Sequence, residues 1–480
     1  MKHVHLIGIG GAGMSGLAEI LLLRGMIVSG SDTASNKKTE ELASLGAKIF
    51  IGHDVQNVEG ADVLLYSSAV SEENIERQEA ARRGIRQVRR ADFLREIVAG
   101  HVVVAVAGTH GKTTTTSMIA LVLIEAGLDP LVLVGASVKE LGGKNSRAGA
   151  GRIAVVEADE FDRSFLALGG SYISVLTSLE AEHLDTYGTF DALKDAFVQF
   201  ANQSDSASVI AGNGFPGQHR QGYTVVSIDD PTLREITPRL EKKMVTYGID
   251  APETKYRAKD MVQNGHRTHA TLIRSGDRAG EIELRVPGRH NVQNALAAIA
   301  VADILSIPLE ITLRALRRFT GADRRFERIG EAGGITVIDD YAHHPTEVKA
   351  TLTAARAVYP GRRLIACFQP HTFTRTRDFA DGFGEAFATN ADLFVLLDIY
   401  PAREEPIEGV TSDLIETAAQ KNGMTSVYRV SQPQELSQLL EQILEPGDVV
   451  LTMGAGTITA AAPVIVHDLE TNLPQTVDEL

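Results

Sequence analysis

The chain has 480 residues, of which 47 are Lys or Arg and 62 are Asp or Glu, giving a formal net charge of -15. This length exceeds what one hydrophobic core organises and predicts about three domains. The composition, 44% hydrophobic and 23% charged, excludes a mainly disordered or fibrous protein. The negative charge disfavours general binding to nucleic acid or to an anionic membrane, so we expect neither as a partner.

The remaining composition bears on the cellular compartment. The single cysteine, Cys367, excludes an internal disulfide framework and fits a reducing environment. Glycines interrupt the apolar opening of the chain at once, so residues 3–7 predict a buried strand and not a secretory signal. No apolar run approaches the roughly 18 residues of a membrane span. We therefore expect a cytoplasmic protein.

Short apolar runs alternate with helical stretches along the chain, which predicts parallel sheets built from α/β units. The expected strands are residues 4–9, 63–66, 102–107, 153–156, 173–176, 335–338, 364–368, 393–397 and 449–453. Residues 244–286 alternate polar and apolar positions and predict appended antiparallel strands. A helical spacing of apolar residues follows at 291–305. We place domain boundaries near residues 99 and 321.

A first glycine-rich loop follows the first strand and opens a helix. Its glycines are Gly8, Gly10, Gly11 and Gly13, and Asp32 closes the next short strand. Backbone N–H groups and the helix N-terminus in such a loop face a pyrophosphate, and the acid suits a ribose hydroxyl. NAD, FAD and UDP-sugars all fit this pattern, and so does a glycine turn that only packs the helix on the strand.

A second glycine-rich loop follows the strand at 102–107 and leads into a helix expected over 117–126. The loop residues are Gly108, Thr109, His110, Gly111, Lys112, Thr113 and Thr114. In a phosphate-binding loop the lysine meets the outer phosphates, the amides cradle them, and the threonine hydroxyl holds Mg²⁺. This loop is shorter than the general one, because Val106 stands where the longer loop has its first glycine.

Carboxylates crowd the turn after the strand at 153–156. Glu157, Asp159, Glu160 and Asp162 follow within six residues. Each close pair of like charges costs about 4 kcal/mol at an effective dielectric of 20, which a bound cation relieves. The turn is therefore either a metal site or a solvated acidic loop. His183, after the strand at 173–176, is either a further ligand or a structural histidine.

The shortened loop Gly-Thr-His-Gly-Lys-Thr-Thr resembles that of the Mur ligase and folylpolyglutamate synthetase superfamily, and the resemblance extends over the whole chain. It is carried further by Gly-Ile-Gly-Gly-Ala-Gly-Met-Ser-Gly at 8–16, Glu-Ala-Asp-Glu at 157–160, His-Leu-Asp at 183–185, His-Asn-Val-Gln-Asn at 290–294, Arg-Arg-Phe at 324–326, Asp-Asp-Tyr-Ala-His-His-Pro at 339–345 and Gln-Pro-His at 369–371.

The resemblance implies an α/β protein of three domains. Residues 1–99 are expected to form a Rossmann-like domain that binds a UDP-sugar. Residues 100–321 are expected to form a central ATP-binding domain, similar to P-loop ATPases, with a mostly parallel sheet and an appended antiparallel sheet. Residues 322–480 are expected to form a Rossmann-like C-terminal domain that binds the amino acid and closes on ATP.

The resemblance also implies roles for individual residues. Two Mg²⁺ sites are expected, with Thr113, Glu157 and His183 as ligands. ATP contacts are expected from the second loop and from Asn291, Arg325 and Asp339. The UDP-sugar is expected at the first loop, Asp32 and Ser67, and the amino acid at Tyr341, His371 and Arg375. The implied catalytic residues are Lys112, Glu157, His183, His343 and Arg375.

The implied reaction is the ATP-dependent joining of L-alanine to the lactyl carboxylate of UDP-N-acetylmuramate through an acyl phosphate. A related ligase that attaches a tripeptide to the same sugar nucleotide is the nearest alternative. Two other classes of function remain as alternatives. A nicotinamide-dependent oxidoreductase would bind its cofactor at the first glycine-rich loop, but this function leaves the second loop unexplained. A protein that hydrolyses ATP as a switch would need no acceptor substrate. We expect a monomer or a weak homodimer.

Overall fold

The computed structural model describes residues 2–203 and 222–472. Parts of the expected central and C-terminal domains, 204–221 and 473–480, lie outside the described residues. The chain groups into two compact units. The first unit comprises residues 1–260, 270–283 and 291–320, and the second comprises residues 261–269, 284–290 and 321–480.

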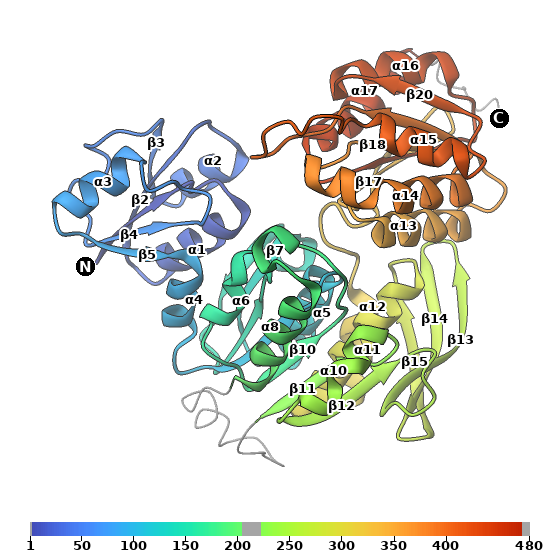
Figure 1. The fold of residues 1–480 in the computed structure, drawn as a ribbon. Helices are drawn as coiled ribbons and strands as arrows, with labels where there is room; N and C mark the ends of the chain where they lie inside the picture. Colours follow the sequence, from blue (N-terminus) through green and yellow to red (C-terminus); the bar gives the residue numbers. More distant parts are fainter. Residues whose placement is uncertain (1, 204–221, 473–480) are drawn as a thin grey trace, which may run out of the picture. The chain divides into compact units, whose positions relative to one another are not determined.

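The first unit begins with a five-stranded parallel sheet in the order β3-β2-β1-β4-β5 (Figure 1). Its strands are β1 (His3–Ile7), β2 (Ile27–Asp32), β3 (Lys48–Ile51), β4 (Val63–Tyr66) and β5 (Arg86–Arg89). Its helices are α1 (Ala12–Leu23), α2 (Lys37–Ser44), α3 (Ile75–Arg82) and α4 (Arg90–Val98). Strand β1 ends two residues earlier than expected, because Gly8 turns the chain with a φ of 72°.

The same unit carries most of a ten-stranded sheet, in the order β15-β14-β13-β12-β11-β10-β6-β9-β7-β8. Its strands are β6 (Val102–Ala107), β7 (Leu131–Val138), β8 (Lys144–Ala148), β9 (Ile153–Glu157), β10 (Ile173–Leu176), β11 (Tyr223–Ser227), β12 (Lys243–Gly248), β13 (Tyr256–Asn264), β14 (Arg267–Arg274) and β15 (Asp277–Leu284). The expectation of antiparallel strands from residue 244 is wrong for β12, which pairs in parallel with β11 and β13. Two-residue turns join β13, β14 and β15, and so short a connection requires antiparallel neighbours.

The helices of the central region include one whose start differs from expectation. They are α5 (Lys112–Glu125), α6 (Ser164–Ala167), α7 (Leu184–Tyr187), α8 (Phe190–Asn202), α10 (Pro231–Ile236), α11 (Arg289–Ile304) and α12 (Leu309–Arg318). Helix α5 was expected from residue 117 but begins at Lys112, directly after Gly111. Its run of four threonines has low helix propensity, yet all four are buried, so packing overrides local preference.

The second unit contains a six-stranded sheet in the order β16-β17-β21-β18-β19-β20, parallel except for β16. Its strands are β16 (Glu327–Ala332), β17 (Ile335–Asp340), β18 (Leu364–Phe368), β19 (Leu393–Leu397), β20 (Val427–Val430) and β21 (Val449–Met453). Its helices are α13 (Pro345–Val358), α14 (Phe373–Asn390), α15 (Asp413–Lys421), α16 (Leu436–Ile443) and α17 (Ala461–Asn472).

Alternate residues of this sheet build two cores. Ala366 and Phe368 of β18 pack with residues of α13, α14 and α15, whereas Ile365 and Cys367 pack with residues of α16 and α17. This alternation follows from the two-residue period of a strand covered by helices on both faces. The burial of Cys367 raises the pKa of its thiol, so the lone cysteine is an unreactive core residue.

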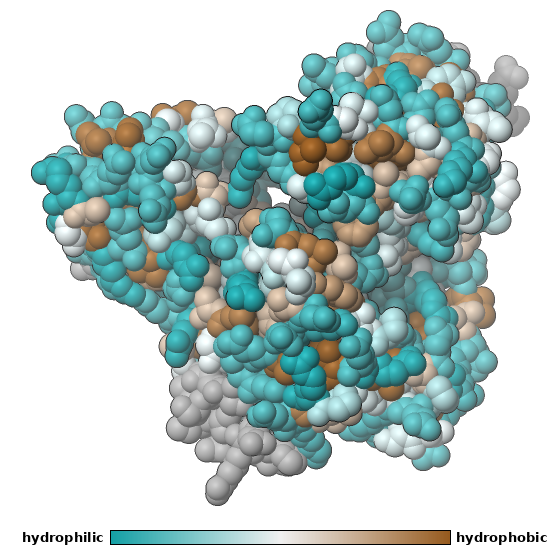
Figure 2. Space-filling model, viewed as in Figure 1, coloured by the Kyte–Doolittle hydropathy of each residue, from teal (hydrophilic) through white to brown (hydrophobic). Residues whose placement is uncertain are grey.

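The three sheets confirm the expected α/β fold class, whereas the boundaries near residues 99 and 321 remain predictions. The face of the molecule in Figure 2 is mostly hydrophilic, with smaller hydrophobic patches. Among the described residues, no helix combines the length and the hydropathy that crossing a bilayer requires.

Close packing between two helices of the second unit generates a stability prediction. A Cβ atom added to Gly384 of α14 would lie 2.5 Å from the Ala418 backbone of α15. Replacing a helical glycine by alanine gains about 1 kcal/mol of propensity, but overpacking costs about 1–3 kcal/mol. We expect Gly384→Ala to lower the urea midpoint, while Asp381→Ala, at an exposed position of the same helix, does not lower it. A raised midpoint for Gly384→Ala would contradict this packing.

Candidate functional site

The second glycine-rich loop lies at the carboxyl end of β6, between two parallel neighbours. The sheet order β10-β6-β9 brings the segments after all three strands to one edge. In open α/β sheets this edge is where ligands bind. The loop is fixed there because the His110 N–H donates to the Ser178 hydroxyl over 2.8 Å and the Glu180 N–H donates to the Thr109 hydroxyl over 2.9 Å.

Two glycines of this loop leave no room for a side chain. Gly111 has a φ of 81°, and a Cβ atom on it would lie 2.7 Å from the amide oxygen of Asn294 in α11. A Cβ atom on Gly108 would lie 2.0 Å from the hydroxyl of Thr177. Asn294 also accepts a hydrogen bond from Thr115 over 3.1 Å, and so it ties α11 to the start of α5. Asn291, one helical turn earlier, is buried beside Asn294.

Lys112 lies among carboxylates at this edge of the sheet. Its ammonium donates to the Gly108 carbonyl over 2.8 Å and to both carboxylate oxygens of Glu160 over 2.9 Å, and Asp159 lies 4.0 Å away. Burial alone would lower the pKa of Lys112, but Glu160, Asp159 and Glu157 outweigh it and raise that pKa. Lys112 therefore stays charged, and it offers a phosphate group a fixed cation.

Glu160, one of the four acids of the expected acidic turn, is buried, and its pairing with Lys112 was not foreseen from the sequence. Its side chain is 2% exposed, and burial raises its pKa to about 7 against the opposing charge of Lys112. The Tyr187 hydroxyl donates to the Glu160 backbone carbonyl over 2.6 Å. In the sequence, the available signal for Glu160 was its position three residues beyond Glu157, the last residue of a buried strand.

The expected metal ligands fall into two groups. The Thr113 hydroxyl donates to Glu157 over 3.0 Å, and the second Glu157 oxygen accepts the Gly135 N–H over 2.6 Å. His183 lies instead with Glu160 and Glu182, whose ligand atoms are all within 4.8 Å of one another. His183 has a φ of 55° and directly precedes α7. Hydroxyl and carboxylate oxygens suit Mg²⁺, so the first group has the right donor chemistry, and the second joins His183 to Glu160 of the acidic turn and to its neighbour Glu182.

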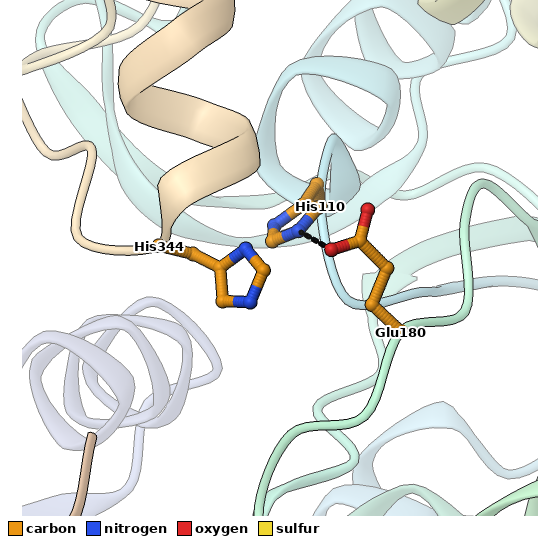
Figure 3. A group of neighbouring side chains, drawn as sticks. All are labelled: His110, Glu180 and His344. Atoms are coloured by element: carbon orange, nitrogen blue, oxygen red, sulfur yellow. Dashed lines mark ion pairs between the residues drawn. The ribbon is translucent and has the colours of Figure 1, made fainter. Parts of the chain in front are cut away.

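His110 provides a further polar contact of the loop. Its Nε2 atom lies 3.5 Å from a Glu180 carboxylate oxygen (Figure 3). Glu180 follows β10, so this pair also joins the ends of β6 and β10. The contact orients the His110 ring beside the loop.

The first glycine loop is built at the carboxyl edge of the five-stranded sheet. Asp32 accepts the Gly10 N–H over 2.8 Å, and its other oxygen accepts the Thr33 N–H over 2.8 Å. A Cβ atom on Gly13 would lie 2.9 Å from the guanidinium of Arg90, the first residue of α4. Arg90 places a cation beside the loop that sequence reasoning missed, although its position after β5 was a signal. Ser67 follows β4 at the same edge.

In the second unit, Asp339 is buried and its carboxylate is already engaged. It accepts hydrogen bonds from Arg324 over 3.0 Å, from Thr452 over 2.7 Å and from Thr459 over 2.8 Å. This geometry gives Asp339 a role in orienting Arg324, and its direct contact with ATP stays a prediction. The Arg325 guanidinium lies over the Tyr341 ring, 5.1 Å from its centre.

The residues expected at the amino-acid site lie together in the second unit. The ring centres of Tyr341 and His343 are 5.0 Å apart, and those of His343 and His371 are 6.3 Å apart. Arg375 contacts the His371 ring over 3.1 Å, and the Tyr400 ring lies 5.7 Å from His371. Tyr400 was not foreseen, because its place depends on a bridge between residues 371 and 400.

Three family models match consecutive parts of the chain. The catalytic domain of the Mur ligase family matches residues 3–102, the Mur ligase middle domain matches 106–302, and the Mur ligase glutamate ligase domain matches 324–456. The chain belongs to the Mur ligase family.

Relatives and solved structures within the family resemble the chain over nearly its full length. It is 44% identical to the UDP-N-acetylmuramate–L-alanine ligase of Sorangium cellulosum, over 99% of this chain and 98% of the relative. The crystal structure of UDP-N-acetylmuramate-alanine ligase from Thermotoga maritima has a TM-score of 0.82 at 28% identity, covering 98% of this chain and 100% of that one. A murein peptide ligase from Psychrobacter arcticus has a TM-score of 0.72 at 24% identity, covering 99% and 100%.

The position of Lys112 predicts that the loop binds a polyphosphate. Lys112→Met keeps the size of the side chain but removes its charge, and a hydrogen bond to a charged group contributes about 1.5–3 kcal/mol. We expect the Kd for inorganic triphosphate, measured by calorimetry, to rise by about tenfold or more. Lys194→Met is the matched control, since Lys194 is also 14% exposed and paired with carboxylates. Equal affinities of the two variants would remove Lys112 from phosphate binding.

Proposed function

We propose that the chain joins L-alanine to the lactyl carboxylate of UDP-N-acetylmuramate with ATP, the first amino-acid addition in the synthesis of the peptidoglycan precursor. The observation that carries the proposal is the 44% identity to an L-alanine ligase over 99% of the chain. The arrangement of Lys112, Glu157 and Thr113 at one sheet edge supports it, because these groups suit a nucleoside triphosphate.

In this proposal, each of the three expected domains binds a different substrate. Residues 1–99 bind the UDP-sugar, with Arg90 and the first glycine loop at its pyrophosphate. Residues 100–321 bind ATP, and residues 322–480 bind L-alanine and close on ATP during the reaction. The nucleotide substrates place the reaction in the cytoplasm.

The reaction proceeds in two steps that need no covalent enzyme intermediate. The lactyl carboxylate attacks the γ-phosphate of ATP, and ADP leaves. The amine of L-alanine then attacks the resulting acyl phosphate, an amide bond forms, and inorganic phosphate leaves. Carboxylate and triphosphate are both anions, so the main task of Lys112 is to neutralise and align them.

We propose that Thr113 and Glu157 hold one Mg²⁺ and that His183, with Glu160 and Glu182, holds a second. Bound Mg²⁺ supplies positive charge that stabilises the transferring phosphoryl group. The oxygen donors of the first group match its preference for hard ligands. Gly135 fixes the Glu157 carboxylate for this role through its N–H group.

In the second unit, we propose that Arg375 binds the carboxylate of L-alanine. A guanidinium binds a carboxylate with two parallel hydrogen bonds. His371 orients Arg375 through their 3.1 Å contact, while Tyr341 and His343 line the same cluster.

A panel of acceptors tests the proposed function. With UDP-N-acetylmuramate and ATP present, we expect phosphate release to be fastest with L-alanine and slower with glycine, L-serine and the tripeptide L-alanyl-γ-D-glutamyl-meso-diaminopimelate. Faster release with the tripeptide would assign the chain to the recycling ligases instead. Equal release without any acceptor would indicate a hydrolytic switch.

The Arg90 side chain predicts a separate effect on the UDP-sugar. Because its guanidinium lies beside Gly13, Arg90→Ala removes a cation from the pyrophosphate. Loss of one charged hydrogen bond predicts a rise of about tenfold in the KM for UDP-N-acetylmuramate, with the KM for ATP unchanged. Arg86→Ala, which breaks only an exposed ion pair with Glu96, is the control. A larger effect on ATP than on the UDP-sugar would mean that the two glycine loops have been assigned the wrong ligands.

A further inference from the structure

The hairpin of β7 and β8 is irregular at one place. Leu131 to Leu133 pair regularly with residues 146–148, and the pairing then shifts before Val138 meets Lys144. Gly135 lies in the irregular part of β7, and Asn145 lies between Lys144 and Ser146 on β8. Such bulges re-aim backbone and side-chain groups and are frequent beside active sites.

On one side, this bulge contacts the expected metal ligand Glu157. The Gly135 N–H donates to Glu157 over 2.6 Å, and a Cβ atom on Gly135 would lie 2.7 Å from the same carboxylate. The position of Glu157 therefore depends on the position of β7.

The neighbouring strand contacts the first glycine loop. The Asn145 side-chain amide donates to the Ala12 carbonyl over 2.6 Å, and Ala12 lies between Gly11 and Gly13. Asn145 is 4% exposed, so the bond is shielded from water. The loop that faces the UDP-sugar is thus held by the hairpin that holds Glu157.

Contacts of two carboxylates, Glu19 and Glu140, further anchor the hairpin. The buried carboxylate of Glu19 in α1 accepts the Ser146 hydroxyl over 2.6 Å and pairs with Lys144. In the turn between β7 and β8, Glu140 accepts the N–H and the hydroxyl of Thr320 over 2.7 and 2.8 Å. The Glu19 contacts therefore tie the hairpin to α1 through buried polar groups.

We propose that the bulged β7–β8 hairpin couples binding of the UDP-sugar to binding of ATP, with Asn145 as the positioning residue that joins the first glycine loop to Glu157. A ligand that shifts Ala12 displaces Asn145, and the hairpin carries the shift to Gly135 and Glu157. By linkage, each ligand then changes the affinity of the other by the same factor. This inference rests on the proposed function.

The test measures the coupling directly in the full-length chain. The Kd of UDP-N-acetylmuramate is determined by calorimetry with and without a saturating, non-hydrolysable ATP analogue and Mg²⁺. In the unmodified protein we expect the analogue to tighten binding by at least about fivefold, within the usual range of allosteric coupling. In Asn145→Ala we expect this factor to fall below about twofold, while each ligand bound alone keeps its affinity within about twofold.

The controls separate coupling from general damage. Arg147→Ala alters the same strand but removes only an exposed ion pair with Asp129, so its coupling factor should equal that of the unmodified protein. Ser146→Ala, which cuts the Glu19 contact, should reduce the factor even if Asn145→Ala does not fold. If coupling is undiminished in both Asn145→Ala and Ser146→Ala, the inference is overturned. The absence of coupling in the unmodified protein also overturns it. Neither result affects the proposed function. Failure of the unmodified protein to bind either ligand overturns the proposed function as well.

Discussion

The organisation of the central site depends on one constraint, which is the burial of the Lys112 charge among carboxylates at the ends of three adjacent parallel strands. A lone buried ammonium is strongly unfavourable, and Glu160 compensates it at 2.9 Å. That pairing requires Glu160 to follow β9 while the lysine follows β6. The sheet order β10-β6-β9 satisfies this requirement and also brings the segment before His183 to the same edge.

The ion pair also explains how the site is ready for an anion before one binds. Burial raises the pKa of Glu160 to about 7, while the neighbouring carboxylates raise the pKa of Lys112, so the lysine remains a cation. A polyphosphate that reaches Lys112 therefore meets a fixed positive charge. In the proposed reaction that charge offsets the repulsion between two anionic substrates.

Several strands and both glycine loops could be predicted from the sequence. The structure confirms the expected bounds of β4, β6, β10, β18, β19 and β21, because short apolar runs between helices have few alternatives when both faces are buried. The glycine loops followed from spacing. The start of α5 did not, because four threonines resemble a loop until their burial is known. Arg90 and Asn294 were missed, since only the tertiary fold brings them against Gly13 and Gly111.

In the proposed reaction, the site around Lys112 transfers the γ-phosphoryl group of ATP to the lactyl carboxylate. The most direct measurement of this transfer uses UDP-N-acetylmuramate in which both oxygens of the lactyl carboxylate are a heavy isotope. After the reaction, mass spectrometry locates the heavy oxygens in the products. Phosphoryl transfer leaves one carboxylate oxygen on the phosphate that departs, so we expect one labelled oxygen in each released phosphate. Unlabelled phosphate would contradict it, whether both heavy oxygens remain in unreacted UDP-N-acetylmuramate or one of them is found in AMP.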